Sequence, residues 1–168
     1  MTTLLFAHGL ESAPIGRKSQ ALIEAGYEVI APDGRGRDLA ARIAGLLEVL
    51  EGLPSPPVLV GSSFGGIAGL VAAIMAGRRG RGVPGLVLCA PALQLPPPPH
   101  TVDALERPAP TIIVHGTRDE VIPIALSRAF VREHGGRLIE VDDDHALHAS
   151  VARGDLLDWV RGVAGRSE

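Results

Sequence analysis

Aromatic residues, cysteine and long apolar runs are all scarce in this chain, and each shortage excludes something. Only 3% of the 168 residues are aromatic, so the core must consist mainly of Ala, Val, Leu and Ile. The single cysteine, Cys89, excludes an intrachain disulfide and is expected to be a small buried apolar residue. The longest apolar run, residues 67–76, is shorter than the about 18 residues that a membrane-spanning helix needs. We therefore expect no membrane span.

Charge of one sign is also scarce. The net charge of −3, without a long run of either sign, argues against nucleic acid or an anionic membrane as the main partner. Residues 1–6 contain neither a basic leader nor a full apolar signal core, which predicts a cytoplasmic protein. With 46% hydrophobic and 21% charged residues, the composition is that of an ordered globular protein. Residues 1–168 are expected to form one domain.

Short apolar runs, many of them rich in β-branched residues, recur along the chain. Their hydrophobicity is continuous and does not alternate, which is typical of parallel strands buried on both faces. The 21 glycines and 14 prolines supply many turns between them. We predict six strands, at residues 3–8, 27–31, 57–61, 85–90, 111–115 and 137–141.

Helical patterns separate these strands. Asp38 can cap a helix that residues 52–57 break, and residues 64–76 are apolar nearly all round, as in a helix buried within a layered fold. Strand–helix alternation predicts a three-layer α/β protein with a mainly parallel six-stranded sheet and helices on both faces. The other predicted helices cover residues 15–25, a single turn at 102–106, a segment from Pro123 to Gly135, and residues 146–163 with a possible break at Gly154.

One stretch carries a reactive motif. Residues 58–67 read VLVGSSFGGI, so an apolar strand leads into Gly-x-Ser-x-Gly and a buried helix follows. This context is that of a nucleophile elbow, with Ser63 as the central serine and Ser62 at the x position. Because a serine on so sharp a turn crowds neighbouring chains, Gly61 and Gly65 must lack side chains.

Polar residues follow the ends of other strands. In a parallel sheet, ligands meet the carboxyl ends of the strands. Ser63 follows the third predicted strand, Asp119 the fifth and His145 the sixth. The order Ser, Asp, His is that of the α/β-hydrolase triad. The sequence therefore predicts a serine hydrolase, without a metal or cofactor.

These motifs identify a family resemblance. The chain resembles α/β-hydrolase-fold serine hydrolases. More narrowly, residues 4–14 (LLFAHGLESAP), Lys18 and residues 61–66 (GSSFGG) are similar to small predicted esterases of the YqiA type. The resemblance implies a minimal fold without a cap domain. The chain begins at what is usually the family's third strand, so two antiparallel edge strands are expected to be absent.

The resemblance also implies roles for individual residues. Ser63 would be the nucleophile, His145 the general base and then the acid for the leaving group, and Asp119 the residue that orients the imidazole. The backbone N–H groups of Phe64 and Leu10 would form the oxyanion hole.

Other assignments remain open. His148 could replace His145 as the base, and Glu120 could replace Asp119 as the acid. Asp142, Asp143 and Asp144 are expected to serve as turn and helix-capping residues. The alternative, a metal site made from these aspartates with His145 and His148, would leave Ser63 unexplained. Three further groups are expected to be structural: His8 and His115 as packed histidines that bond nearby backbone, Ser12 and Lys18 as supports of the Leu10 loop, and Arg78, Arg79 and Arg81 as solvated residues.

The connection at residues 91–110 limits the substrate. It occupies the place where many α/β-hydrolases insert a lid, but it is too short for a cap domain and contains four consecutive prolines. An open site favours small to medium carboxylic esters or thioesters over lipase or peptidase action. The rival hypothesis is a hydrolase fold that binds a partner with little or no turnover. An apolar wall for the acyl or alcohol group could come from Leu93, Leu95, Val102 and Leu105, although at least two of them could instead pack in the core.

Overall fold

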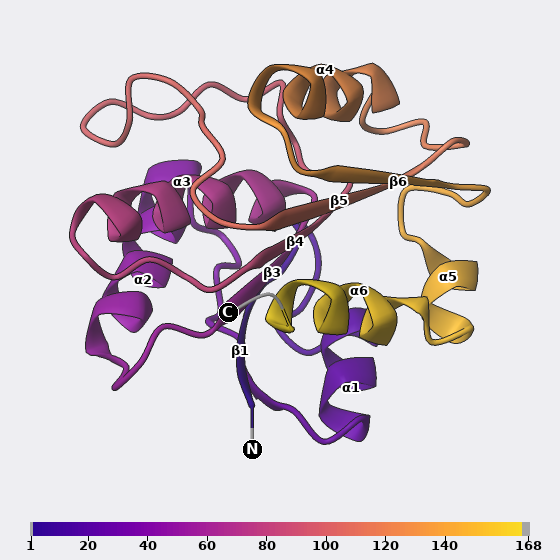
Figure 1. Ribbon diagram of the computed structural model, residues 1–168, viewed down its shortest axis with the longest axis horizontal. Coiled ribbons are helices and arrows are strands. Elements are labelled where there is room, and N and C mark those ends of the chain that lie inside the picture. Colours follow the sequence, from indigo (N-terminus) through magenta and orange to yellow (C-terminus); the bar gives the residue numbers. More distant parts are fainter. Residues whose placement is uncertain (1, 166–168) are drawn as a thin grey trace.

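The structure is a computed structural model that describes residues 2–165, and a parallel six-stranded sheet lies at its centre (Figure 1). The strand order is β2-β1-β3-β4-β5-β6, and every neighbouring pair is parallel. The predicted fold class is therefore confirmed. The strands are β1 (Thr3–Ala7), β2 (Glu28–Ile30), β3 (Val58–Ser62), β4 (Leu86–Cys89), β5 (Thr111–Gly116) and β6 (Arg137–Val141).

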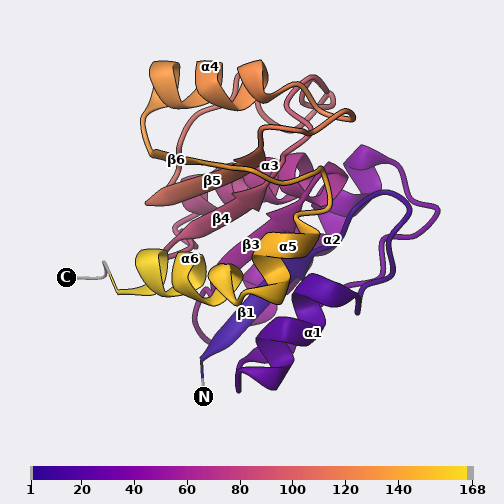
Figure 2. The ribbon, with the colours of Figure 1, turned by 90° about the vertical axis from the view of Figure 1, so that its right-hand side faces the viewer.

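Helices cover both faces of this sheet, as Figures 1 and 2 show. One face carries α2, α3 and α4, and the other carries α1, α5 and α6. Within residues 2–165, no helix is long and apolar enough to cross a bilayer. The helices are α1 (Arg17–Glu24), α2 (Leu39–Gly52), α3 (Phe64–Arg78), α4 (Ile124–His134), α5 (His148–Ala152) and α6 (Asp155–Ala164).

The sheet separates two apolar cores. Alternate residues of the central strands point to opposite faces, so that Leu5 and Leu59 join the core under α2 and α3, whereas Leu4 and Val60 join the core under α6. Nearly all of α3 is buried. Burial on both faces explains why the strands read as continuous apolar runs.

The order of the strands positions the candidate site. The chain runs from β1 outward to β2, then returns to the other side of β1 to form β3. At such a reversal, the loops after the two central strands leave in opposite directions and open a crevice between them. The loop after β1 and the turn after β3 therefore meet where ligands usually bind in this class of sheet.

Two predictions about helices have different outcomes. The single turn predicted at residues 102–106 is wrong: this segment is irregular, because so short a segment between proline-rich stretches cannot meet the cost of helix nucleation. The break predicted at Gly154 is confirmed, since this glycine has φ +85° and separates α5 from α6. The closing helical region begins at His148 and not at Ala146.

The start of α2 follows its sequence closely. Asp38 accepts a hydrogen bond from the N–H of Ala41 at 2.9 Å, which confirms the predicted cap. The apolar stripe of α2, formed by Leu39, Ile43, Leu46, Leu47 and Leu50, is buried or packs against the core. The same face also buries Arg42, which the apolar pattern does not predict.

Candidate active site

Ser63 lies on a tight turn between β3 and α3. Its backbone has φ +56° and ψ −114°, a conformation that side-chain-bearing residues rarely adopt. The neighbouring chains approach closely, because a Cβ atom on Gly65 would lie 2.0 Å from the carbonyl oxygen of Ala7. A Cβ atom on Gly61 would lie 2.8 Å from the carbonyl oxygen of Gly65. Both glycines are therefore required, as the motif predicts.

The expected acid and base lie in line with this serine. Ser63 Oγ is 3.1 Å from His145 Nε2, and His145 Nδ1 is 2.7 Å from Asp119 Oδ2. The Asp119 side chain is fully buried, whereas that of His145 is 24% exposed. An Nδ1–H that donates to the carboxylate leaves Nε2 as an acceptor facing the serine hydroxyl. This arrangement can take a proton from Ser63 and return it to a leaving group.

Asp119 is held as a carboxylate. Its Oδ1 accepts hydrogen bonds from the N–H groups of Val121 and Ile122, both at 2.8 Å. Burial acts to raise the pKa of Asp119, but the hydrogen bonds from His145, Ile122 and Val121 outweigh it and lower the pKa below its ordinary value. The acid of this arrangement therefore stays charged when His145 needs its support.

His115 adds a contact to Asp119 that the sequence analysis missed. Its Nε2 lies 2.9 Å from the carbonyl oxygen of Ile122 and 3.1 Å from Asp119 Oδ2, and its Nδ1 lies 2.8 Å from Ser127 Oγ. The expectation of a packed histidine that bonds nearby backbone is confirmed. No local spacing signals the second contact, because His115 lies at the end of β5 and Asp119 lies in the loop that follows.

The rival acid and base lie elsewhere. His148 begins α5 and is exposed, and Glu120 is exposed as well. Among the described residues, neither makes a hydrogen bond with Ser63 or Asp119. The geometry therefore favours His145 and Asp119 over both alternatives.

Most residues of the other acidic and basic clusters have structural partners, but Oδ1 of Asp144 is buried without a hydrogen-bond partner among the described residues. Asp143 is buried and accepts hydrogen bonds from Ser150 N and Oγ, both at 2.8 Å, so it binds an N–H group in the first turn of α5, although the N-cap position itself is Leu147. In the described part of the chain, no three His, Cys, Asp or Glu side chains are placed to hold a metal ion. The remaining partners are Glu106 for Arg78, Glu51 for Arg79, the carbonyls of Leu50 and Leu53 for Arg81, and Arg118 for Asp142.

The loop after β1 lies beside the serine turn. A Cβ atom on Gly9 would lie 3.8 Å from the carbonyl oxygen of Ser62, and one on Gly65 would lie 2.5 Å from the carbonyl oxygen of His8. Within residues 2–165, the backbone N–H groups of Leu10 and Phe64 donate to no protein acceptor. Both are thus available to bind an oxygen that develops negative charge.

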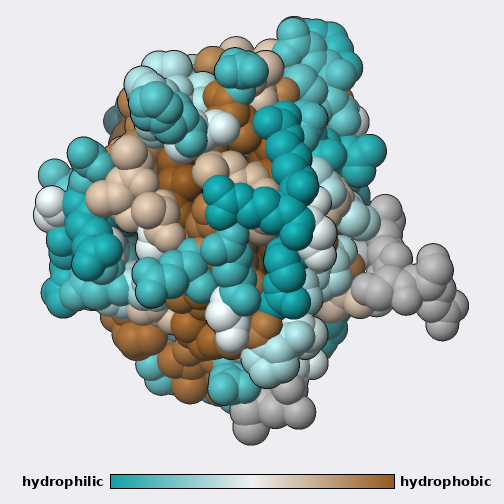
Figure 3. Space-filling view, turned by 90° about the vertical axis from the view of Figure 1, so that its left-hand side faces the viewer, coloured by the Kyte–Doolittle hydropathy of each residue, from teal (hydrophilic) through white to brown (hydrophobic). Residues whose placement is uncertain are grey.

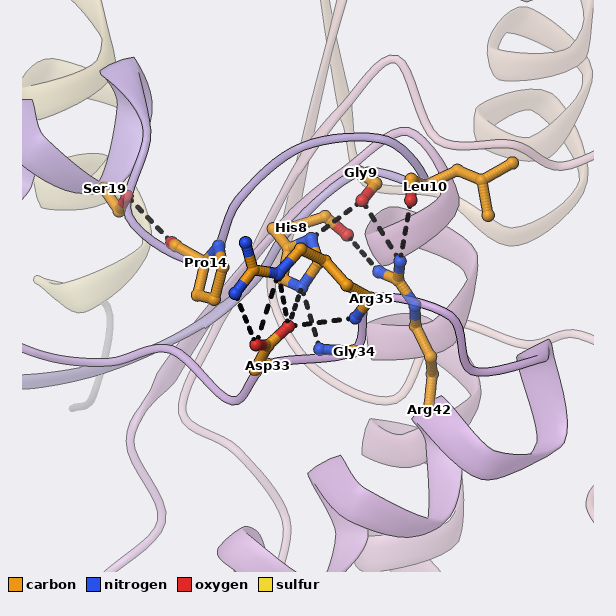
Figure 4. Close-up of polar contacts among 9 residues, drawn as sticks. All are labelled: His8, Gly9, Leu10, Pro14, Ser19, Asp33, Gly34, Arg35 and Arg42. Atoms are coloured by element: carbon orange, nitrogen blue, oxygen red, sulfur yellow. Dashed lines mark hydrogen bonds and ion pairs between the residues drawn. The ribbon is translucent and has the colours of Figure 1, made fainter.

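Arg42 supports this loop from below, as Figure 4 shows. Its Nη1 donates to the carbonyl oxygen of His8 at 2.7 Å, and its Nη2 lies 3.2 Å from the carbonyl oxygens of both Gly9 and Leu10. The only sequence signal was an arginine next to Ile43 within the apolar stripe of α2.

His8 closes the same network as a packed histidine. Its Nδ1 lies 2.8 Å from the carbonyl oxygen of Gly9, and its Nε2 accepts a hydrogen bond from the N–H of Gly34 at 2.9 Å. These bonds require the tautomer with the proton on Nδ1. The expectation for His8 is therefore confirmed, and burial lowers its pKa.

Lys18 supports a different loop from the one expected. Its Nζ donates to the carbonyl oxygen of Ala146 at 2.9 Å. Lys18 therefore anchors the segment that carries His145, whereas the sequence analysis assigned it to the Leu10 loop. The reason is that α1 packs beside α5, so residues separated by 128 positions meet.

An open groove of about 770 Å³ lies beside His145. Six of its eight lining residues are polar or charged, and all eight come from the loops that carry Asp119 and His145. A cavity of about 190 Å³ between α1 and α5 includes Ser62, Lys18 and His148. The groove borders Asp119 and His145 and can receive part of a substrate, whereas the cavity is lined by Ser62 and Ala146, the sequence neighbours of Ser63 and His145.

The expected apolar wall packs largely against the core. Val102 is buried, and Leu93, Leu95 and Leu105 are partly buried against the core under α2, α3 and α4. None of these four residues lines the groove beside His145. The connection does start at the serine turn, because Ala92 N–H donates to the carbonyl oxygen of Ser63 at 3.0 Å.

Figure 3 shows hydrophobic surface between hydrophilic residues on the side where α2 and α3 lie.

Known proteins share both the sequence pattern and the fold of this chain. Residues 4–163 match the model of a family described as the alpha/beta hydrolase family. A solved structure described as a hydrolase of the alpha/beta superfamily, from Xanthomonas campestris pv. campestris, is 29% identical with a TM-score of 0.80. The match covers 98% of this chain and 99% of that one. No curated protein matches the chain significantly.

More distant structures share the fold. Est1E from Butyrivibrio proteoclasticus is 19% identical, with a TM-score of 0.74 over 98% of this chain and 89% of that one. A monoacylglycerol lipase from Paleococcus ferrophilus is 18% identical, with a TM-score of 0.67 over 94% of this chain and 93% of that one. At these identities, the likeness concerns the arrangement of strands and helices.

Proposed function

The chain belongs to the alpha/beta hydrolase family, and from that premise we propose that it is a serine hydrolase acting on small to medium carboxylic esters or thioesters. One observation carries the proposal: Ser63 Oγ, His145 and the buried Asp119 form one continuous hydrogen-bonded chain. Residues 1–168 act as a single hydrolase domain in this proposal. The lipase among the structural neighbours is consistent with ester chemistry.

Acylation begins at Ser63. His145 Nε2 takes the hydroxyl proton as Oγ attacks the carbonyl carbon of the substrate. Asp119 stabilises the imidazolium that forms, and the N–H groups of Leu10 and Phe64 bind the oxyanion. Collapse of the tetrahedral intermediate breaks the ester or thioester bond, and His145 gives its proton to the departing alcohol or thiol. The acyl group remains on Ser63.

Deacylation repeats these steps with water. His145 removes a proton from a water molecule that attacks the acyl carbonyl, and the same two N–H groups bind the second oxyanion. The intermediate then releases the carboxylic acid, and the proton on His145 returns to Ser63 Oγ. The N-terminus of α3 begins at Phe64, so its dipole also favours negative charge at this point.

Labelling with a fluorophosphonate probe tests the nucleophile. We expect the wild-type protein to label, the Ser63→Ala variant not to label, and the Ser62→Ala variant to label. Ser62 is a matched control because it is the neighbouring hydroxyl on the same turn. Equal labelling of Ser63→Ala and wild type would reject the assignment.

A series of p-nitrophenyl esters from acetate to laurate, together with matching thioesters, tests the substrate class. We expect turnover to be highest for the short and medium chains. The absence of turnover across the whole series, in a protein that still labels at Ser63, would reject the proposed substrate class.

A further inference from the structure

Arg42 is a buried cation without an acidic partner. Arg42 is only 5% exposed. Within residues 2–165, no carboxylate oxygen lies within 4.0 Å of its guanidinium. Burial lowers the pKa of Arg42, although Asp33 acts in the opposite direction. Burying a charge in this way costs stability unless other groups replace water. Three backbone carbonyls do so for its two Nη groups, and all three belong to the loop after β1, whereas Nε has no hydrogen-bond partner among the described residues.

These carbonyls determine the direction of a donor. In a trans peptide, the C=O of one residue and the N–H of the next point in opposite directions. The peptide bonds of the described chain are all trans. When Arg42 holds the carbonyl of Gly9, it therefore turns the N–H of Leu10 away from the guanidinium. The carbonyl of Leu10 is held as well, so the peptide groups on both sides of that residue are restrained.

The same guanidinium also contacts the residue that bears the second donor. Its central carbon lies 4.9 Å from the centroid of the Phe64 ring, a cation–π distance. We propose that Arg42 is a positioning residue that holds the two N–H groups of the oxyanion hole in their reactive arrangement. This role rests on the proposed function of Ser63. Arg42 touches no substrate; it acts through the backbone of Leu10 and the ring of Phe64.

The surroundings of Arg42 are built for this contact (Figure 4). His8 reinforces it, because its Nδ1–H shares the carbonyl of Gly9 with the guanidinium. A Cβ atom on Gly34 would lie 2.7 Å from Arg42 Nε, so only glycine allows the side chain to pass. Asp33 is not the counterion, since it pairs with Arg35 at 2.7 Å.

The Arg42→Met variant tests the proposal, with Arg81→Met as a matched control. Arg81 also donates to backbone carbonyls, but those of Leu50 and Leu53, away from Ser63. We expect Arg42→Met to lower kcat about 10²-fold, because misplaced oxyanion donors weaken binding of the transition state. We expect KM to change by less than about threefold, since the ground-state ester needs these donors less. Arg81→Met should retain wild-type kcat.

A thionoester substrate separates positioning from general damage. Replacing the carbonyl oxygen by sulfur weakens its interaction with the oxyanion hole, so an intact hole strongly prefers the ester. We expect the ratio of kcat/KM for the ester to that for its thionoester to fall at least about tenfold in Arg42→Met. Variants that merely lower the amount of folded protein reduce both rates equally and leave this ratio unchanged. An unchanged ratio would overturn the proposal.

Two further variants cover the case in which Arg42→Met does not fold. Arg42→Lys keeps the charge but not the fork, and we expect an intermediate kcat and an intermediate ester to thionoester ratio. Arg42→Ala would enlarge the existing cavity of about 30 Å³ beside His8 and Gly34, and we expect added guanidinium, but not methylammonium, to restore kcat.

The outcomes distinguish this proposal from the proposed function. If the wild-type protein labels at Ser63 and turns over esters while all Arg42 variants keep the wild-type kcat and substrate ratio, only the role of Arg42 is rejected. If the wild-type protein neither labels nor turns over esters, the proposed function itself fails. Failure of guanidinium to restore Arg42→Ala, together with a wild-type ratio in Arg42→Lys, would also reject the role of Arg42.

Discussion

The loop after β1 and the loop after β6 both border Ser63, but helices from opposite faces of the sheet hold them. Arg42, on α2, holds the β1 loop through three carbonyls from a buried position. Lys18, on α1, holds the β6 loop through the single carbonyl of Ala146 from a half-buried position. In both loops, a cationic side chain holds backbone carbonyls, while other groups of the same loop face Ser63.

The difference follows from what each loop contributes. The β1 loop offers a backbone N–H, whose direction depends wholly on the peptide planes around it. The β6 loop offers the side chain of His145, which Asp119 also orients at 2.7 Å. Asp143 gives the same loop a second anchor at α5. In the β1 loop His8 shares only the carbonyl of Gly9 with Arg42, so the loss of Arg42 should matter more there than the loss of one restraint in the β6 loop.

Loss of the general base should have the largest effect, because the side chain of His145 is what the β6 loop contributes to the site. We expect His145→Ala to lower kcat by about 10⁴-fold or more, because no other group can take the proton of Ser63. Steady-state kinetics with a p-nitrophenyl ester measures it. His148→Ala is the matched control and should keep activity near wild type; the reverse pattern would transfer the role of base to His148.

Loss of the acid comes next. We expect Asp119→Asn to lower kcat about 10³- to 10⁴-fold, because an amide can donate to His145 Nδ1 and stabilise the wrong tautomer. In the wild-type protein, Nε2 of His115 lies 3.1 Å from Asp119 Oδ2. The amide of the variant therefore also faces this nitrogen. The pH profile of kcat/KM measures the loss, with Glu120→Gln as the neighbouring control. A larger loss in Glu120→Gln would contradict the assignment.

Loss of the Asp143 anchor should lower the free energy of unfolding. Burial acts to raise the pKa of Asp143, but hydrogen bonds, chiefly from Ser150 and Asp144, lower it to about 2 from an ordinary value of 3.8. We therefore expect Asp143→Asn to lower the free energy of unfolding by about 2 kcal/mol at neutral pH. Because the folded-state pKa is the lower one, this difference should be full above pH 3.8 and vanish as the pH falls toward 2. Urea unfolding at several pH values measures it, and a pH-independent difference would contradict this explanation.

The Lys18 anchor should have the smallest effect. We expect Lys18→Met to lower kcat/KM about fivefold to tenfold, well below the loss in Arg42→Met, because one hydrogen bond to Ala146 is lost while His145 keeps its bond to Asp119. Arg17→Met, at the neighbouring exposed position of α1, is the control. A loss in Lys18→Met as large as that in Arg42→Met would remove the contrast between the two loops.

The local parts of the fold could be predicted because their signals are local. The buried strands appear as continuous apolar runs, Asp38 appears directly before its helix, and Gly154 interrupts the closing helical pattern. The serine turn is equally local, since Gly61 and Gly65 flank Ser63 within five residues of sequence. The turn predicted at residues 102–106 failed because a short helical pattern without packing partners carries little free energy.

The sequence predicted the candidate site only to the extent that the arrangement of the strands determines it. Parallel strands place their carboxyl ends along one edge, so Ser63, Asp119 and His145 could be expected to meet without knowledge of side-chain packing. The contact of His115 with Asp119 depends on how the β5 loop folds back. The apolar wall remains a prediction, since Val102 and its neighbours pack mainly against the core.

What the sequence alone determined is the α/β fold, the sharp serine turn and the order of the three candidate residues, because periodicity and motif spacing act over a few residues. The tertiary structure alone decided what holds those residues in place. Arg42 meets the β1 loop across more than thirty residues of sequence, and Lys18 meets Ala146 across 128. Such contacts depend on which helix face packs against which strand end, and no local pattern encodes a single hydrogen bond between a cation and a distant carbonyl.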